Sequence, residues 1–184
     1  MRVSRRMFLG VVGAVPALAR GGVAMPRCVV VDLGCVLRES FVGFKGQVGD
    51  LRYRDMGAEI LIAPGVNSLG GDDREFIRRW LRRGATVVLE YAGGARISTG
   101  AYFPYVEYFW PVRVKIREFA AVLLQPAPGD EVIATFQGQP VGLRRRVYDG
   151  TLVTLGSPLG PVFLTGDPDA RRWLDALVQL HIER

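Results

Sequence analysis

Apolar residues along the chain gather in short runs that glycine and proline separate. The most continuous of these runs lie at 29–33, 59–63 and 86–91. Such runs are typical of parallel strands that are covered on both faces. Residues 72–83 carry apolar side chains at helical spacing, with Asp72 placed to cap the helix and Gly84 placed to end it. We therefore predict a strand–helix–strand unit with a right-handed crossover and parallel pairing over residues 59–91.

The second half of the chain follows a different pattern. Residues 112–116 alternate apolar and polar side chains, as in a strand with one exposed face. Residues 131–136 and 141–147 flank a turn and predict a hairpin, a buried strand follows at 151–155, and Asp167 caps a final helix. The expected fold is one α/β domain with a mostly parallel, flavodoxin-like sheet, flanked by helices and extended by antiparallel hairpin strands in the C-terminal half.

The first residues resemble the bacterial twin-arginine export signal. Arg5 and Arg6 stand in the sequence Ser-Arg-Arg-Met-Phe-Leu, and an uncharged apolar stretch follows to residue 19. This stretch has the length of a signal-peptide core and is too short to span a bilayer of about 30 Å. We expect residues 1–24 to be a signal peptide for the twin-arginine translocase, with cleavage after Ala19 or Ala24. The domain at 25–184 is then periplasmic or secreted, or membrane-tethered if the signal is not cleaved.

The formal net charge of +6 overstates how basic the domain is. Removing the four arginines of residues 1–24 leaves +2, which gives little reason to expect a nucleic-acid partner. Arg144, Arg145 and Arg146 follow one another in a predicted strand, where alternation points Arg145 away from its neighbours. They are therefore not expected to form one site for a polyanion.

Three segments carry a resemblance to a known family. These are Ile60-Leu61-Ile62-Ala63-Pro64-Gly65, then 87–94 with its Gly93-Gly94, and the tail 150–159. Together they resemble the class I glutamine amidotransferase-like superfamily over roughly residues 27–180. The resemblance implies a Pro-Gly loop whose backbone amides face an oxyanion, and a catalytic Cys-His-Glu triad.

The triad of that family is missing from this chain. Ala92 stands at the nucleophile position, and Ser157-Pro158-Leu159 occupies the place of the His-x-Glu pair. No cysteine follows position 35, and the single histidine, His181, lies on the final helix. The resemblance therefore implies the fold without glutaminase activity. Non-catalytic relatives include trehalose-utilisation-like domains and the trimerisation domain of some β-galactosidases, which suggests a carbohydrate-related role.

The most plausible ligand site is the edge of the sheet where the parallel strands end. Candidate ligand-binding residues at that edge are Asp32, Gly65, Asn67, Ser68, Glu90, Tyr91 and Ser157. Their glycine amides can bind an anion or a sugar hydroxyl, or the glycines can serve only to shape turns.

Aromatic residues are concentrated just after the third strand. They are Tyr102, Phe103, Tyr105, Tyr108, Phe109 and Trp110. As a flap they can stack on sugar rings or bind a partner protein, and as core residues they can cover the sheet.

We therefore expect an exported, non-catalytic domain that binds a small, carbohydrate-related ligand or a partner protein. One alternative is a hydrolase of envelope carbohydrate that uses Glu90 and Asp32 as paired carboxylates. Another is an accessory subunit exported together with a cofactor-bearing partner. No cofactor or metal of the chain's own is expected.

Overall fold

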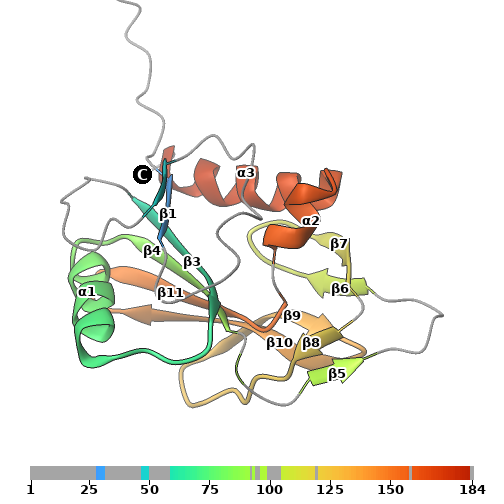
Figure 1. Ribbon diagram of the computed structural model, residues 1–184, viewed down its shortest axis with the longest axis horizontal. Coiled ribbons are helices and arrows are strands. Elements are labelled where there is room, and N and C mark those ends of the chain that lie inside the picture. The colour runs from blue at the N-terminus through green and yellow to red at the C-terminus, as the bar shows by residue number, and fades with distance from the viewer. Residues whose placement is uncertain are drawn as a thin grey trace, which may run out of the picture.

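The computed structural model of the chain describes residues 28–31, 47–49, 59–91, 93, 96–98, 105–118, 120–157 and 159–182 (Figure 1). The strands are β1 (Cys28–Val31), β2 (Gln47–Gly49), β3 (Ile60–Val66), β4 (Thr86–Tyr91), β5 (Arg96–Ser98), β6 (Tyr105–Tyr108), β7 (Val114–Arg117), β8 (Ala120–Val122), β9 (Glu131–Phe136), β10 (Gln139–Val147) and β11 (Gly150–Leu155). The helices are α1 (Gly71–Arg82), α2 (Gly160–Leu164) and α3 (Pro168–Ile182). None of these helices is long and apolar enough to cross a bilayer.

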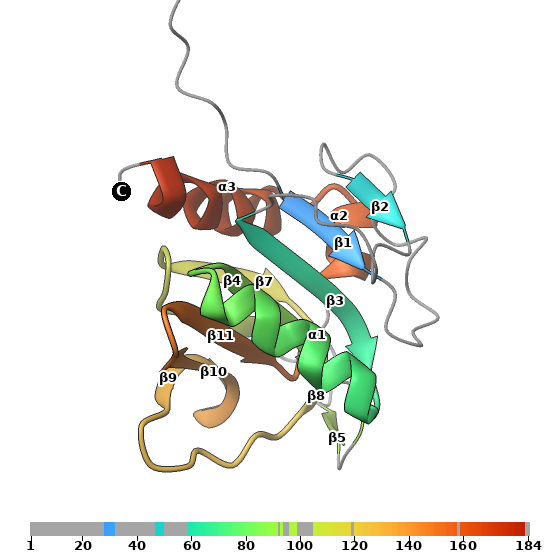
Figure 2. The same cartoon turned by 90° about the vertical axis from the view of Figure 1, so that its left-hand side faces the viewer.

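The main sheet is half parallel and half antiparallel. Its strand order is β2-β1-β3-β4-β11-β10-β9-β6-β7, and a separate small sheet pairs β5 with β8. In this order, neighbouring strands from β2 to β11 are parallel, whereas neighbouring strands from β11 to β7 are antiparallel. The antiparallel half curls away from the parallel half, as β10 shows in Figure 2.

The prediction of a mostly parallel, flavodoxin-like sheet is therefore wrong. The antiparallel strands are not a hairpin appended to a parallel sheet, because they make up half of it. The reason lies in β6, which pairs with β7 on one side and with β9 on the other. The aromatic segment at 105–108, expected as a flap or a core cover, is thus a strand that joins the later strands into one sheet.

Several local expectations are confirmed. Strands β3 and β4 pair in parallel around α1, and β9 and β10 form the expected hairpin. Asp167 caps α3, since its Oδ1 accepts hydrogen bonds from the amides of Asp169 (2.8 Å) and Ala170 (3.0 Å). Asp72, however, does not cap α1. The N-cap is Gly70, two residues earlier, and the Asp73 carboxylate accepts a hydrogen bond from the Gly70 amide (3.2 Å).

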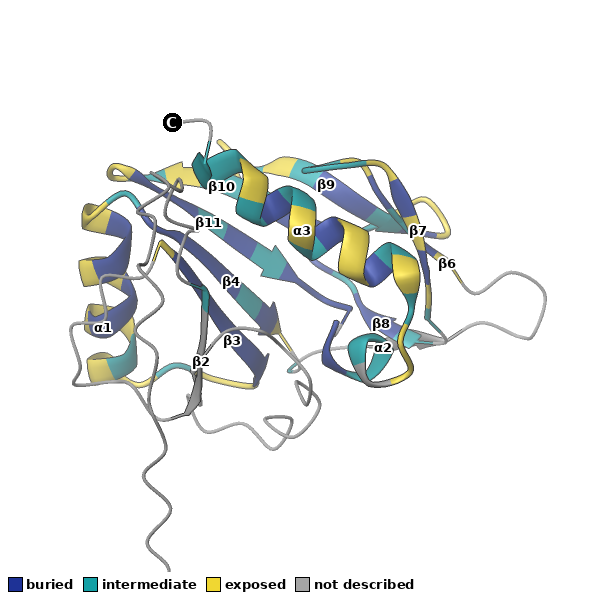
Figure 3. Ribbon diagram, turned by 90° about the horizontal axis from the view of Figure 1, so that it is seen from above, coloured by how far each residue is buried: buried dark blue, intermediate teal, exposed yellow. Residues whose placement is uncertain are grey.

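Two apolar cores lie on the two faces of the sheet. Side chains alternate along β3, so that Ile60 and Ile62 face one core while Leu61 and Ala63 face the other. The core that contains Ile60 packs against α3, and the core that contains Leu61 packs against α1. Figure 3 shows α3 lying across the sheet. Because the parallel strands are covered on both faces, their sequences are apolar without alternation.

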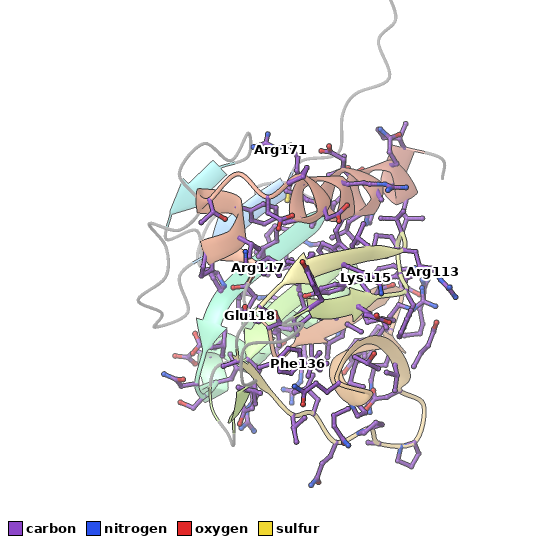
Figure 4. All side chains as sticks on the ribbon, turned by 90° about the vertical axis from the view of Figure 1, so that its right-hand side faces the viewer. Arg113, Lys115, Arg117, Glu118, Phe136 and Arg171 are labelled. Atoms are coloured by element: carbon purple, nitrogen blue, oxygen red, sulfur yellow. The ribbon has the colours of Figure 1, made fainter. Side chains whose placement is uncertain are left out.

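The antiparallel half ends at β7, which pairs with β6 and with no other described strand. Val114 and Ile116 are buried, and Lys115 and Arg117 are exposed between them. Lys115 pairs across the strands with Glu107 (2.6 Å). Figure 4 shows Lys115 and Arg117, with Arg113 just before the strand, along this margin of the molecule.

Candidate functional site

Because β1, β3, β4 and β11 run in parallel, their carboxyl ends meet at one edge of the sheet. Glu90 pairs in register with Leu155, and Tyr91 with Val66. The predicted residues that the structure brings to this edge are Gly65, Asn67, Ser68, Glu90, Tyr91 and Ser157. Asp32 lies outside the described residues, so its expected pairing with Glu90 stays a prediction.

One part of this edge, which we call the rim, faces solvent and consists of Asn67, Ser68 and Tyr91. Asn67 and Ser68 are exposed, and Tyr91 is 38% exposed. Gly93 lies close to Asn67 and Tyr91, because a Cβ added there would lie 2.9 Å from the Asn67 carbonyl oxygen and 3.3 Å from the Tyr91 hydroxyl. The rim offers an amide, a hydroxyl and an aromatic ring with a polar tip. These groups suit a neutral ligand that carries hydroxyl groups.

The other part of the edge is sealed around Glu90, which is 1% exposed. Its Oε1 accepts a hydrogen bond from the Leu159 amide (2.8 Å). Burial raises the pKa of Glu90 from 4.5 to about 7, although the amides of Leu159, Gly160 and Gly65 act in the opposite direction. The Gly65 amide, which the family resemblance assigns to an oxyanion, therefore faces a carboxylate of the chain itself.

More buried polar groups surround this carboxylate. Glu90 Oε2 and the Tyr108 hydroxyl are both buried, and neither has a hydrogen-bond partner among the described residues. Ser157, also 1% exposed, donates a hydrogen bond to Glu118 (3.4 Å). Burial raises the pKa of Tyr108, the nearby Ser157 side chain acts in the opposite direction, and the charges of Glu90 and Glu118 raise it further. Glu118 was not anticipated from the sequence, because it follows an ordinary half-exposed strand and belongs to no motif.

This arrangement leaves Glu90 without access to a substrate. A carboxylate that acts as a general acid, base or nucleophile must touch the bond that breaks. Glu90 instead ties the end of β4 to the segment after β11. Among the described residues, no three histidine, cysteine, aspartate or glutamate side chains lie together as a metal site would require.

The aromatic segment is divided between the two faces of the sheet. Tyr105 and Phe109 are exposed, at 40% and 43%. Tyr108 is buried and its ring lies 5.6 Å from that of Trp173. Trp110 is half-buried, and its carbonyl accepts a hydrogen bond from Trp173 Nε1 (2.8 Å). The segment is thus partly core and partly surface.

Other predicted residues lie outside the part of the chain that the structure describes. These are Arg5, Arg6, Tyr102 and Phe103. The export signal and the first two residues of the aromatic segment therefore stay predictions.

No known family model and no curated protein matches the chain. Its fold is similar to part of a β-galactosidase from Rahnella sp. R3, with 12% identity and a TM-score of 0.59, over 85% of this chain and 31% of that one. It is also similar to a catalytic mutant of Gan42B, a GH42 β-galactosidase from G. stearothermophilus, with 10% identity and a TM-score of 0.54, over 77% and 29%.

A third similar structure is a cytoplasmic protein from Salmonella typhimurium, with 9% identity and a TM-score of 0.56. This match covers 84% of the present chain and 98% of the Salmonella protein. The chain thus covers 24% to 36% of the length of the glycosidases that it matches, but nearly all of the Salmonella protein. At such low identity these matches show the fold alone.

Proposed function

We propose that the chain is an exported, non-catalytic binding domain of the class I glutamine amidotransferase-like type, whose rim binds a neutral carbohydrate. The observation that carries this proposal is the contrast within one edge of the sheet. Tyr91, Asn67 and Ser68 are open to solvent, whereas the catalytic candidate Glu90 is buried at the same edge. A half-exposed tyrosine ring can stack on the apolar face of a sugar, and the neighbouring amide and hydroxyl can bind its hydroxyl groups.

The similar structures give one reason to propose a carbohydrate-related role. The matched glycosidases are β-galactosidases and an exo-β-1,4-mannosidase, and the chain corresponds to one part of each. A domain that accompanies a catalytic unit can assist it by holding a sugar without performing chemistry. The sealed Glu90 is consistent with this role and disfavours the alternative of a hydrolase that uses Glu90 and Asp32.

A second candidate function is docking of a partner protein, as in the co-exported accessory subunit. It is favoured by Tyr105 and Phe109, which are exposed on β6 and just after it. The Arg113 guanidinium lies 5.8 Å from the centre of the Phe109 ring, so this surface combines aromatic and cationic groups. Aromatic and arginine side chains are enriched at protein interfaces.

The deciding experiment is calorimetric titration of the chain with β-linked galactose and mannose oligosaccharides. We expect Tyr91→Ala to weaken binding at least about fivefold, because loss of a stacked ring costs about 1 kcal/mol or more. Tyr148→Ala is the matched control, since Tyr148 is also exposed but lies in the turn between β10 and β11.

Three results would contradict the proposal in different ways. Binding that survives Tyr91→Ala excludes the rim as the site. Cleavage of an aryl glycoside that is lost in Glu90→Gln identifies a hydrolase instead. Oligosaccharides that fail to bind, together with a co-purified partner that Tyr105→Ala or Phe109→Ala releases, favour the docking function. Cell fractionation tests export, because a full chain that stays in the cytoplasm contradicts it.

A further inference from the structure

A pocket lies at the opposite end of the parallel strands, where β4 and β11 begin. Its volume is about 410 Å³, and the sheet, Trp110 and the last turn of α3 line it. Thr86 and Thr151 are the buried polar residues that line it, and they are paired in register on neighbouring strands. Arg146 pairs with Thr151 on the next strand, so a polar row crosses three strands at this end of the sheet.

The three consecutive arginines have different partners here. Arg144 is bound to Glu131, and its guanidinium lies 4.6 Å from the centre of the Trp110 ring. Arg145 is bound to Asp130, with 2.6 Å between Nε and Oδ1. Arg146 is exposed and has no carboxylate partner among the described residues. The pocket therefore holds one guanidinium whose charge is not neutralised by a neighbouring acid.

Other hydrogen-bonding groups complete the lining. His181 Nε2 lies 3.0 Å from Thr86 Oγ1, and Thr151 contributes a second hydroxyl. The last carbonyl groups of a helix have no partners within the helix, and those of α3 can accept hydrogen bonds from a ligand's hydroxyl groups. The same carbonyls carry partial negative charge, so an anionic group must lie on the Arg146 side of the pocket.

We propose that this pocket binds a sugar acid, meaning a small molecule with one carboxylate and several hydroxyl groups. The planar guanidinium of Arg146 matches a carboxylate in two parallel hydrogen bonds. The threonine hydroxyls, Glu131 and the end of α3 provide donors and acceptors for the ligand's hydroxyl groups. The volume falls within the range of small-molecule sites, about 300–1,000 Å³, and exceeds what a bare inorganic anion fills.

The test is titration of the full chain with galacturonate, with neutral galactose as a probe of matched shape and with acetate and phosphate as simple anions. We expect galacturonate to bind at least about tenfold more tightly than the other three, and added salt to weaken it. Arg146→Ala should remove most of the binding, and Arg146→Lys should recover only part of it, because lysine keeps the charge but lacks the planar fork. Arg171→Ala is the control, since Arg171 is an exposed arginine outside the pocket.

Each alternative outcome overturns the proposal. In the Tyr91→Ala variant, where the rim is disabled, equal binding of galactose shows that the carboxylate is not recognised, and equal binding of phosphate shows a bare anion site. Absence of galacturonate binding, or binding that Arg146→Ala leaves unchanged in a folded variant, excludes the pocket. His181→Asn gives a second check, because it alters the α3 side of the pocket without changing Arg146 and should therefore also weaken galacturonate binding. Tyr91→Ala should leave galacturonate binding intact, so this proposal and that for the rim can fail independently.

Discussion

The two ends of the parallel strands differ in where their charged side chains lie: one end buries a carboxylate, and the other lines a pocket with arginines. At the carboxyl end, the Glu90 side chain is turned inward and sealed by backbone amides from distant segments. At the amino end, Arg144 and Arg146 line an open pocket beside two threonines. The edge that is expected to bind ligands in an α/β sheet is thus used partly for internal hydrogen bonding. Binding groups then remain on its outer rim and at the other end of the sheet.

The largest expected effect concerns the packing that closes the carboxyl end. A Cβ added at Gly156 would lie 2.0 Å from the Val122 carbonyl oxygen. The Gly156 carbonyl also accepts a hydrogen bond from the Val122 amide (2.8 Å), so the two segments cannot separate without losing it. We expect Gly156→Ala to lower the free energy of unfolding by about 4 kcal/mol, measured by urea denaturation.

Gly71→Ala is the control for this substitution, because a Cβ at Gly71 would meet nothing within 4 Å. Alanine at this helical position should change stability by about 1 kcal/mol or less, in the stabilising direction. If Gly156→Ala is as stable as the natural chain, the carboxyl end is not closed by this contact.

The next effect is a dependence of stability on pH that originates at Glu90. Its pKa is about 7 in the folded protein and 4.5 ordinarily, so between these values the folded chain holds a proton that the unfolded chain has lost. This bound proton stabilises the folded chain. Its contribution to the free energy of unfolding is complete below pH 4.5 and is lost as the pH rises through 7. Glu90→Gln should therefore be more stable than the natural chain by about 3 kcal/mol at pH 8, and similar to it at pH 4.5.

Urea denaturation of both proteins at several pH values measures this difference. Stability curves that run parallel from pH 4.5 to 8 would show that Glu90 is not desolvated. Such a result would remove the contrast between the two ends of the sheet.

The smallest effect belongs to the amino end. Thr86→Val keeps the shape of the side chain but removes the hydroxyl that lies 3.0 Å from His181 Nε2. We expect a loss of about 1 kcal/mol in the free energy of unfolding, the usual contribution of one hydrogen bond. Thr151→Val should cost less, because no side-chain hydrogen bond of Thr151 is described. Equal losses in the two variants would show that the His181 contact does not stabilise the fold.

The parallel half of the fold could be predicted from the sequence, and the antiparallel half only in part. Strands β3 and β4 are covered on both faces, so nearly every position in them is apolar. Such continuous apolar runs can be recognised in the sequence alone. In β6 the alternation is hidden, because the outward-facing Tyr105 is as aromatic as the inward-facing Tyr108. The place of β6 between β7 and β9 depends on pairing between distant segments, which local patterns do not encode.

The candidate site shows the same limit. The residues of the rim could be predicted, because parallel strands bring their carboxyl ends to one edge. The sealing of Glu90 could not, since the amide that binds it belongs to Leu159, 69 residues further along the chain. The pocket at the amino end was missed for a related reason. It depends on α3 ending above the first residues of β4 and β11.

Strand β7 has a consequence for how the molecule behaves at high concentration. A strand at the margin of a sheet presents backbone groups that another chain can pair with, and such margins are starting points for aggregation. β7 has only four residues, and the charges of Lys115 and Arg117 alternate with its apolar side chains. Short length and charged side chains are features that disfavour the pairing of a further strand at such a margin. This end of the sheet is therefore a poor template for a second chain.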